Sequence, residues 1–494
     1  MRGILTNARR IVAITVVLAA TATAAPASAG KSSFYTVWTV AGSSVQCTTP
    51  PSCGGGGVAT RARLSFPEAV AVGRAGNIFI ADMGDNEIRE VKPSGQVTVV
   101  AGNGAFCQNP PNCGDGEKAT DAELSFPSGI AVDGSGNVYV ADTQDNEVRK
   151  IASSGTITRV AGTGAPCAHP PSCGDGGLAD TAKLTAPAGL AIDRSGNLYI
   201  ADAGDQEIRK LSRSGTITRV AGTGKWCAHP PSCRDGSAAT SARLRFPQAV
   251  ALGRSGTWYI ADGGDQEVRQ VSATGKISTV AGVGKPCSAP PACGDGGPAK
   301  SASLNFPAGV AVGPAGGLFI ADAADHELRE VEGGKIIRLA GDGSPCAKPP
   351  TCGDDHASPS ATLDYPVAVA SDQHGNLYLA DAGDNEVRWL SRARASHIST
   401  STGSVALAAF GPQVGKKSVV VRFIIGQPAD IVLTVHHSGH SATVATRHVQ
   451  AGFGELAWNR QFRGGPAAKG RYRLIVSAAV GHGSTSSTLR VKLS

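Results

Sequence analysis

Short apolar or alternating segments, separated by glycine, serine and aspartate, run through most of the chain. Residues 129–161 show the pattern clearly, with such segments at 129–132, 137–141, 148–151 and 156–161. Each is long enough for one strand, and the residues between them favour tight turns. The pattern predicts four short strands per unit and an all-β fold.

The same unit recurs at a spacing of 60 residues, once 59. Each copy has a Phe-Pro start or a variant of it, an Ala-Asp run after an apolar strand, and, in all but the last, a Val-Ala-Gly type of ending. Periods of this length are typical of propellers and solenoids, and four strands per repeat make one propeller blade. Residues 37–42 form an extra outer strand, which the sixth repeat lacks. We therefore predict a six-bladed β-propeller in which the N-terminal strand closes the last blade.

The second repeat resembles the NHL repeat in the run Phe126-Pro127-Ser128-Gly129-Ile130-Ala131-Val132-Asp133 and in the following Gly136-Asn137-Val138-Tyr139-Val140-Ala141-Asp142. The resemblance recurs in all six units and implies the propeller fold. It implies no single activity, because the family includes protein-binding and RNA-binding modules, sensors and a metal-dependent lyase. Where NHL repeats usually carry an arginine, this chain has glutamate, which argues against nucleic-acid binding. These glutamates are Glu87, Glu147, Glu207, Glu267, Glu327 and Glu386.

The two ends of the chain differ from the repeats. Residues 1–29 combine arginines, an apolar run and a small-residue cleavage site, which predicts a secretory signal peptide. We expect the propeller at 30–395, a linker at 396–403 and a small immunoglobulin-like β-sandwich at 404–494. Residues 456–459 and 469–474 are similar to the FlgD-type immunoglobulin-like domain, which implies a passive adaptor. The apolar run of the signal is too short to span a membrane and no second long apolar segment follows, so we expect a secreted or cell-wall-associated protein.

Cysteines occur once per repeat as a Cys-x5-Cys pair with Pro-Pro in its middle. Zinc would require four ligands, and no histidine recurs in all six loops. With an export signal present, local disulfides are the favoured reading and metal the minor alternative. The expected disulfides join Cys47 to Cys53, Cys107 to Cys113, Cys167 to Cys173, Cys227 to Cys233, Cys287 to Cys293 and Cys346 to Cys352.

An Ala-Asp-x-x-Asp-x-Glu-x-Arg turn also occurs in every repeat. In the first repeat we expect Asp82 to pair with Arg89 and Asp85 to cap the turn. Glu87 and its counterparts lack an obvious partner and would form an acidic ring at which calcium could bind. An active site in a ring is normally made once, so a set repeated six times predicts no catalytic residue and no cofactor beyond that calcium.

Function is expected where the repeats differ. After the proline of each inner strand, at the channel mouth, Glu68, Ser128 and Gln248 replace the apolar residues of the other repeats. The third and fourth cysteine loops add a cluster of aromatic and basic residues, which suits recognition of a carbohydrate, peptide or anionic ligand. The cluster comprises His169, Lys225, Trp226, His229 and Arg234. Ordinary drift of loop sequences would produce the same observation.

These observations favour a monomeric, secreted, disulfide-braced binding or scaffold protein for an extracellular protein, peptide or cell-wall glycan. The alternative is a lactonase-, esterase- or lyase-type enzyme with a metal in the channel, but the inner strands are nearly all Ala, Gly and Val. Charge adds one expectation. Residues 404–494 contain eleven Lys or Arg against Asp430 and Glu455. A basic C-terminal domain could lie against anionic wall polymers, or its charge could serve solubility alone.

Overall fold

A computed structural model describes residues 35–50, 53–111, 113–170, 173–228, 233, 235–290, 293–347, 361–391, 396–400, 403–414, 418–425, 429–449, 452–462, 465–480 and 483–493. Within these ranges the structure consists of strands and short 3-10 turns, with no α-helix. No helix in this part of the chain is long and apolar enough to cross a membrane. The proposed signal peptide lies outside the described residues.

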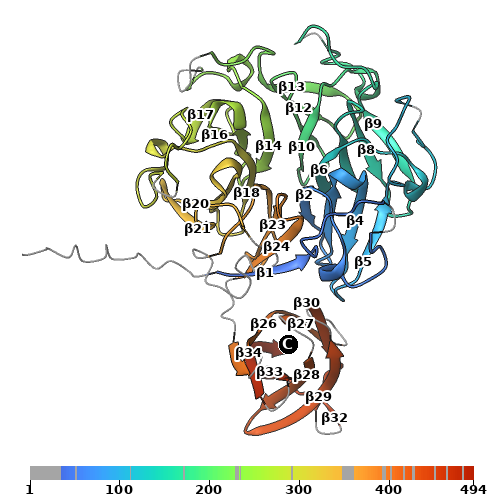
Figure 1. Cartoon of the computed structure of the whole chain (residues 1–494), viewed down its shortest axis with the longest axis vertical. Coiled ribbons are helices and arrows are strands. Elements are labelled where there is room, and N and C mark those ends of the chain that lie inside the picture. The colour runs from blue at the N-terminus through green and yellow to red at the C-terminus, as the bar shows by residue number, and fades with distance from the viewer. Residues whose placement is uncertain are drawn as a thin grey trace, which may run out of the picture. The chain divides into compact units, whose positions relative to one another are not determined.

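Six four-stranded antiparallel sheets make up the first part, and Figure 1 shows them arranged around a common centre. The innermost strands are β2 (Pro67–Val72), β6 (Pro127–Val132), β10 (Pro187–Ile192), β14 (Pro247–Leu252), β18 (Pro307–Val312) and β22 (Pro366–Ser371). The second strands are β3 (Ile78–Asp82), β7 (Val138–Asp142), β11 (Leu198–Asp202), β15 (Trp258–Asp262), β19 (Leu318–Asp322) and β23 (Leu377–Asp381). Each innermost strand lies beside that of the next sheet, and β22 lies beside β2. The arrangement is propeller-like.

The outer half of each sheet has the same plan. The third strands are β4 (Glu87–Val91), β8 (Glu147–Ile151), β12 (Glu207–Leu211), β16 (Glu267–Val271), β20 (Glu327–Glu332) and β24 (Glu386–Ser391). The outer strands are β5 (Val97–Ala101), β9 (Ile157–Ala161), β13 (Ile217–Gly222), β17 (Ile277–Ala281), β21 (Lys335–Ala340) and, from the N-terminal end, β1 (Thr36–Ala41). β1 pairs with β24, and Trp38 lies opposite Trp389. The predicted closure by the N-terminal strand is thus confirmed, and it covers an edge that would otherwise be open.

Short 3-10 turns complete the sheets. One set precedes the inner strands: η1 (Ala59–Arg61), η3 (Ala119–Asp121), η4 (Ala179–Thr181), η5 (Ala239–Ser241) and η7 (Ala299–Ser301). The other set joins second to third strands: η2 (Met83–Asp85), η6 (Gly263–Asp265) and η8 (Ala323–Asp325). After the first set, a leucine such as Leu64 or Leu124 enters the core with no exposed surface. These leucines pack between neighbouring sheets, so the hydrophobic core is distributed around the ring.

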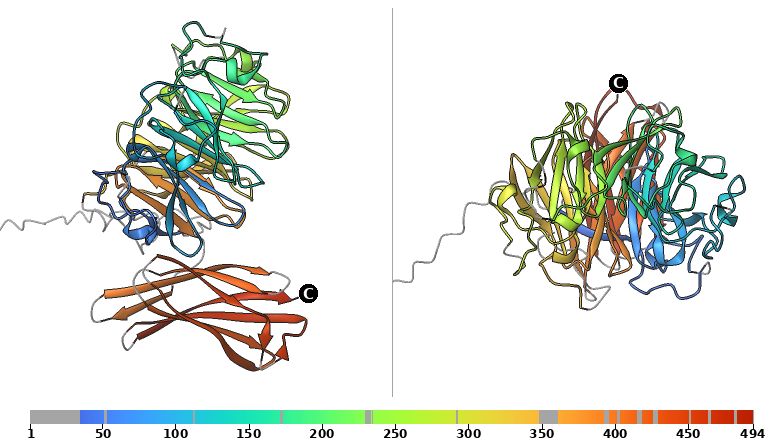
Figure 2. Two further views of the ribbon diagram at one scale, coloured as in Figure 1. Left: turned by 90° about the vertical axis from the view of Figure 1, so that its right-hand side faces the viewer. Right: turned by 90° about the horizontal axis from the view of Figure 1, so that it is seen from above.

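The C-terminal part contains two four-stranded sheets, which Figure 2 shows as two layers. One has the order β25 (Ser396–Thr400), β26 (Gly403–Val414), β27 (Val419–Ile425) and β30 (Gly452–Trp458). The other has the order β29 (His440–Val449), β28 (Ala429–His437), β33 (Gly470–Val480) and β34 (Gly483–Leu493), and β31 (Gln461–Phe462) pairs with β32 (Gly465–Pro466). Their buried side chains, Phe423, Leu433 and Leu474 among them, form one shared core.

The segment expected to be a linker departs from the prediction. Residues 396–400 form β25, which pairs antiparallel with β26, a strand that the sequence analysis did not predict. β25 has Ile398 as its one large apolar residue, and in β26 the apolar residues are interrupted by Ala409 and by Gly411-Pro412, so neither segment has a long regular alternation. Pairing with a sheet that already has a core, rather than their own pattern, accounts for their conformation.

Candidate functional site

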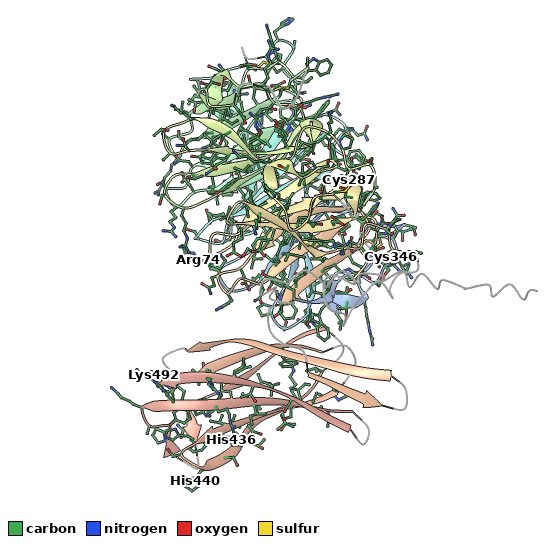
Figure 3. All side chains as sticks on the ribbon, turned by 90° about the vertical axis from the view of Figure 1, so that its left-hand side faces the viewer. Arg74, Cys287, Cys346, His436, His440 and Lys492 are labelled. Atoms are coloured by element: carbon green, nitrogen blue, oxygen red, sulfur yellow. A yellow bond between two sulfur atoms is a disulfide. The ribbon has the colours of Figure 1, made fainter. Side chains whose placement is uncertain are left out.

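One face of the propeller-like part carries the starts of the inner strands and the cysteine loops; we call it the cysteine-loop face. The residue before each inner-strand proline has a left-handed backbone, with φ of 54° at Phe66 and 51° at Phe126. The turns from second to third strands lie on the same face because neighbouring strands are antiparallel. Figure 3 shows Cys287 and Cys346 on this side and Arg74 on the opposite side.

A hydrogen bond across each gap between sheets holds this face together. The backbone N–H of Phe126 donates to Asn86 Oδ1 of the preceding sheet at 3.0 Å, and that of Phe66 donates to Asn385 Oδ1 at 2.9 Å. The equivalent pairs are Ala186 with Asn146, Phe246 with Gln206, Phe306 with Gln266 and Tyr365 with His326. Sequence analysis missed this contact. The sequence did contain an indication of this contact: every repeat has an amide or imidazole side chain between the second Asp and the Glu of the Ala-Asp-x-x-Asp-x-Glu-x-Arg turn.

Beneath the face, each sheet buries an arginine among carboxylates. Arg89 lies 2.7 Å from both Asp82 and Asp85 and 3.0 Å from Glu87. The predicted pairing of Asp82 with Arg89 is confirmed. Asp85, expected to cap the turn, instead accepts a hydrogen bond from Arg89.

The predicted acidic ring is wrong. Glu87 and its five counterparts are at most 2% exposed, because β4 and the equivalent third strands turn them into the interior. Glu147 and Glu207 approach Arg159 and Arg219 of the outer strands at 3.7 and 3.6 Å. The carboxylates therefore neutralise buried arginines rather than forming an exposed set of oxygen ligands for calcium.

The same arginines also form hydrogen bonds and ion pairs with the cysteine loops. Arg149 Nη2 donates to the carbonyl of Cys113 at 3.0 Å and lies 2.9 Å from Asp115 of the same loop. Arg329 repeats this arrangement with Cys293 and Asp295. A loop with little core of its own is thereby held in one place.

Burial dominates the electrostatics of this layer. It raises the pKa of the five glutamates at the start of β4, β8, β12, β16 and β20 to about 7, although the neighbouring arginines lower it. It also raises the pKa of Asp82 well above its usual range. These carboxylates have strongly raised pKa values, but they lie under the face and are repeated from sheet to sheet.

Disulfides close the loops as predicted. Five Cys-x5-Cys pairs are bonded, with Cα atoms 5.6 to 5.7 Å apart. Cys352 of the sixth pair lies outside the described residues. A carboxylate lies near several of these sulfur atoms, as Asp85 does at the first pair. The sulfurs are already bonded to each other, so the alternative of metal binding by these cysteines does not fit the geometry.

The structure brings the third and fourth cysteine loops together. A Cβ atom placed on Gly224 would come within 2.6 Å of Pro170 Cβ, so the two loops are in contact beside His169 and Lys225. Trp226 is 61% exposed, and His169 and Lys225 are exposed as well. The other two members of the predicted cluster, His229 and Arg234, lie outside the described residues.

Arg245 belongs to this patch but was not predicted. Its guanidinium lies 6.0 Å from the centroid of the Trp226 ring. The equivalent residues in the other repeats are Ser65, Ser125, Thr185, Asn305 and Asp364. An arginine found in one repeat alone was the available signal. The cation fixes one face of the indole and leaves an exposed ring beside a positive charge.

More aromatic side chains are exposed on the same face. Phe66, Phe126 and Phe246 are 36% to 42% exposed, and Phe106 packs edge-on against Phe126 with ring centroids 5.1 Å apart. Their left-handed backbone follows from the hydrogen bond between sheets, which holds the peptide N–H in place. The face therefore combines rigid aromatic rings with anchored loops.

The channel mouth holds the remaining predicted residues. Glu68, Ser128 and Gln248 line one narrow cavity of about 90 Å³, together with the apolar residues of the other inner strands. Ser128 hydrogen-bonds the Thr143 hydroxyl, and Gln248 Nε2 donates to the Phe246 carbonyl at 3.3 Å. Burial raises the pKa of Glu68 to about 7. Close approach of the inner strands narrows the channel. A Cβ on Gly129 would meet the Ala188 carbonyl at 2.0 Å.

A larger hollow lies on the opposite face, where sequence analysis placed no site. It measures about 920 Å³ between the second and third sheets, and its walls include Tyr139, Lys150, Arg194 and Asp193. Lys150 lies 5.9 Å from the centroid of the Tyr139 ring. In the sequence, this hollow corresponds to the turn between the first and second strands, whose residues differ from repeat to repeat. In the third repeat this turn contains Asp193 and Arg194.

Comparisons with known sequences agree with the repeat pattern. The model of the teneurin NHL domain matches residues 86–171, 157–232 and 216–292. Teneurin-1 of Homo sapiens is 29% identical over 382 residues, and Teneurin-4 of Mus musculus is 29% identical over 378. These alignments cover 71% and 70% of this chain but only 13% of each relative. The chain carries NHL-type repeats.

Solved structures agree at the level of the fold. A structural genomics protein of unknown function from Bacteroides thetaiotaomicron VPI-5482 superposes with a TM-score of 0.50 at 17% identity, over 72% of this chain and 76% of that one. An auxiliary nutrient binding protein from the same organism gives a TM-score of 0.50 at 13% identity, with the same coverage of both chains. At these identities the likeness concerns the fold alone.

Proposed function

We propose that this chain is a secreted, disulfide-braced binding protein. Its first part is a six-bladed NHL β-propeller whose cysteine-loop face engages an extracellular protein, peptide or glycan. Its second part is an immunoglobulin-like β-sandwich.

The exposure of Trp226 carries the proposal. An exposed apolar patch marks an interaction surface more reliably than one exposed side chain does, and Trp226, 61% exposed, shares its face with the exposed Phe66, Phe126 and Phe246. The Trp226 ring lies beside Arg245, and Trp226 itself precedes the disulfide between Cys227 and Cys233. Little side-chain and loop entropy would be lost when a ligand covers such an anchor. Tryptophan and arginine are also the residue types that contribute most to binding energy at interfaces.

Two further observations support a binding role. The exposed phenylalanines enlarge the apolar area of the face around the channel mouth. A solved structure with the same fold bears the name of a nutrient binding protein, which is compatible with a propeller that binds and releases a ligand.

The channel favours binding over the enzymatic alternative. Its volume of about 90 Å³ has room for a few water molecules and is well below the roughly 300 Å³ of a small ligand pocket. Glu68 is the one carboxylate among its lining residues. A hydrolase or lyase of the propeller type needs several converging polar groups, which this lining does not provide.

Replacing Trp226 with alanine tests the proposal. The mature protein would be applied to arrays of glycans and peptides, and the affinity for each retained compound would then be measured in solution. Loss of the anchor should weaken binding by at least about 2 kcal/mol, while the melting temperature should hardly change because the ring is exposed.

The matched control is Pro286→Ala, which alters the equivalent position of the next cysteine loop. It should bind like the wild type. Equal binding by both variants would place the site elsewhere, and a large drop in the melting temperature of Trp226→Ala would show that the ring is structural.

A further inference from the structure

A strip of positive charge lies at one end of the β29-β28-β33-β34 sheet; we call Arg471, Arg473, Arg490 and Lys492 the basic strip. The strand register places Arg473 directly opposite Arg490, and Arg471 directly opposite Lys492. All four side chains are exposed. Figure 3 labels Lys492 at the same end of this part as His436 and His440.

The basic strip has no counter-ion within the described part of the chain. Neither cross-strand pair includes a carboxylate, and no ion pair to any of the four residues occurs among the described side chains. Asp430, the acidic residue of this sheet, contacts His448 at 2.8 Å. It lies six residues along β28 from His436, which is opposite Arg473, or roughly 20 Å away.

Two like-charge pairs directly opposite each other lower the stability of a sheet. An arrangement that costs stability and serves no contact within the fold points to a site for a ligand of opposite charge. On its other side, Arg473 lies opposite His436 of β28, so no carboxylate lies opposite it on either neighbouring strand.

The basic strip borders a hollow of about 720 Å³, whose walls also include His436, His437 and His440. His437 is held firmly. Its Nδ1 donates to the carbonyl of Arg471 at 2.8 Å, and its ring stacks on Tyr472 with centroids 4.1 Å apart. One side of the hollow is therefore preformed, and the exposed arginine and lysine side chains border it.

We propose that the basic strip binds an extracellular polymer of phosphodiester units. Arginine guanidinium groups bind phosphate oxygens with two parallel hydrogen bonds, for which a lysine is a weaker substitute. The strip extends over two rows about 7 Å apart along the strands and about 5 Å between strands. That extent suits successive phosphates of one chain better than a single small anion. This site is separate from the cysteine-loop face and rests on the proposed function only in that the protein is secreted.

The test uses the complete mature protein and immobilised poly(glycerol phosphate). Binding should weaken steadily as sodium chloride is raised, because counter-ions are released from the polymer. Arg473→Gln should weaken binding about tenfold, since it removes one of the three guanidinium groups of the strip. Arg447→Gln, which removes an exposed arginine of β29 outside the strip, should change binding less than about twofold.

Three results would overturn the proposal. One is equal weakening by Arg473→Gln and Arg447→Gln, which would show that net charge alone matters. Another is equally tight binding to polygalacturonate, whose negative charges are carboxylates instead of phosphodiesters. The third is a fall in the melting temperature of Arg473→Gln, because removal of a like-charge pair should leave stability unchanged or higher. Trp226→Ala should bind the polymer like the wild type, so failure here is distinguishable from failure of the propeller site.

Discussion

Replacing Arg209 with methionine is expected to lower the free energy of unfolding by about 3 to 5 kcal/mol. Arg209 is completely buried and lies 3.3 Å from Asp202 and 3.0 Å from Asp175 of the cysteine loop. It also donates to the carbonyl of Cys173 at 3.3 Å. Methionine would fill much of the same volume but would remove the hydrogen bonds that Arg209 donates to Asp202, Asp175 and the carbonyls of Cys173 and Lys183.

The comparison variant is Arg213→Met, because Arg213 is exposed on the turn between β12 and β13. It should change stability by no more than about 0.5 kcal/mol. Denaturant unfolding of both variants with disulfides intact provides the measurement. If Arg209→Met were as stable as Arg213→Met, the buried arginine would not be what holds the loop and the sheet together.

The propeller should be more stable at about pH 5 than at about pH 8. Burial raises the pKa of Glu87 and of four equivalent glutamates to about 7 in the folded protein. Between the unfolded pKa, about 4.5, and this value, the folded state binds more protons than the unfolded state. The resulting stability is fully present below the unfolded pKa and is lost as the pH rises through about 7. Several glutamates contribute, so we expect a melting temperature higher by at least about 5 °C at the lower pH.

Glu87 is the best single position for testing this dependence. Arg89 alone pairs with three carboxylates there. The residue opposite Arg89 on the outer strand β5 is Val99, whereas the outer strands β9 and β13 have a second arginine at this position. Glu87→Gln should therefore raise the melting temperature at about pH 8 and reduce its variation with pH. Glu117→Gln, at an exposed loop position, is the control and should do neither. A melting temperature that rises with pH, or a Glu87→Gln variant less stable at high pH, would contradict this electrostatic account.

The repeated architecture could be predicted because every copy gives the same signal. One pattern occurs six times, marked by the twelve cysteines, the Phe-Pro starts and the Ala-Asp runs. Comparing the copies therefore predicted the strand order and showed that the last repeat needs residues 37–42 to complete it. The C-terminal strands at β25 and β26 gave one weak signal each. Both segments adopt strand structure by pairing with a formed sheet, which local sequence does not reveal.

The candidate site was predicted less completely, for two physical reasons. Glu87 was expected at the surface because a charged residue is seldom buried, yet a buried arginine beside it reverses that expectation. Arg245 lies 19 residues after Trp226 in the sequence, and their contact depends on the path of the cysteine loop. Trp226 itself was predictable, because the equivalent position is aromatic in just one other cysteine loop, at Phe106, so the repeated structure does not require an aromatic residue there.

Hydrogen–deuterium exchange with a bound ligand tests the central claim most directly. The ligand would be the glycan or peptide that the array retains most tightly, added in excess to the mature protein. We expect slower exchange on the cysteine-loop face, at residues 222–228 and at the start of β14, with no change in the turns at 133–137 and 193–197 of the opposite face. Protection confined to those turns, at the hollow beside Arg194, would contradict the proposed site and place binding on the other side of the propeller.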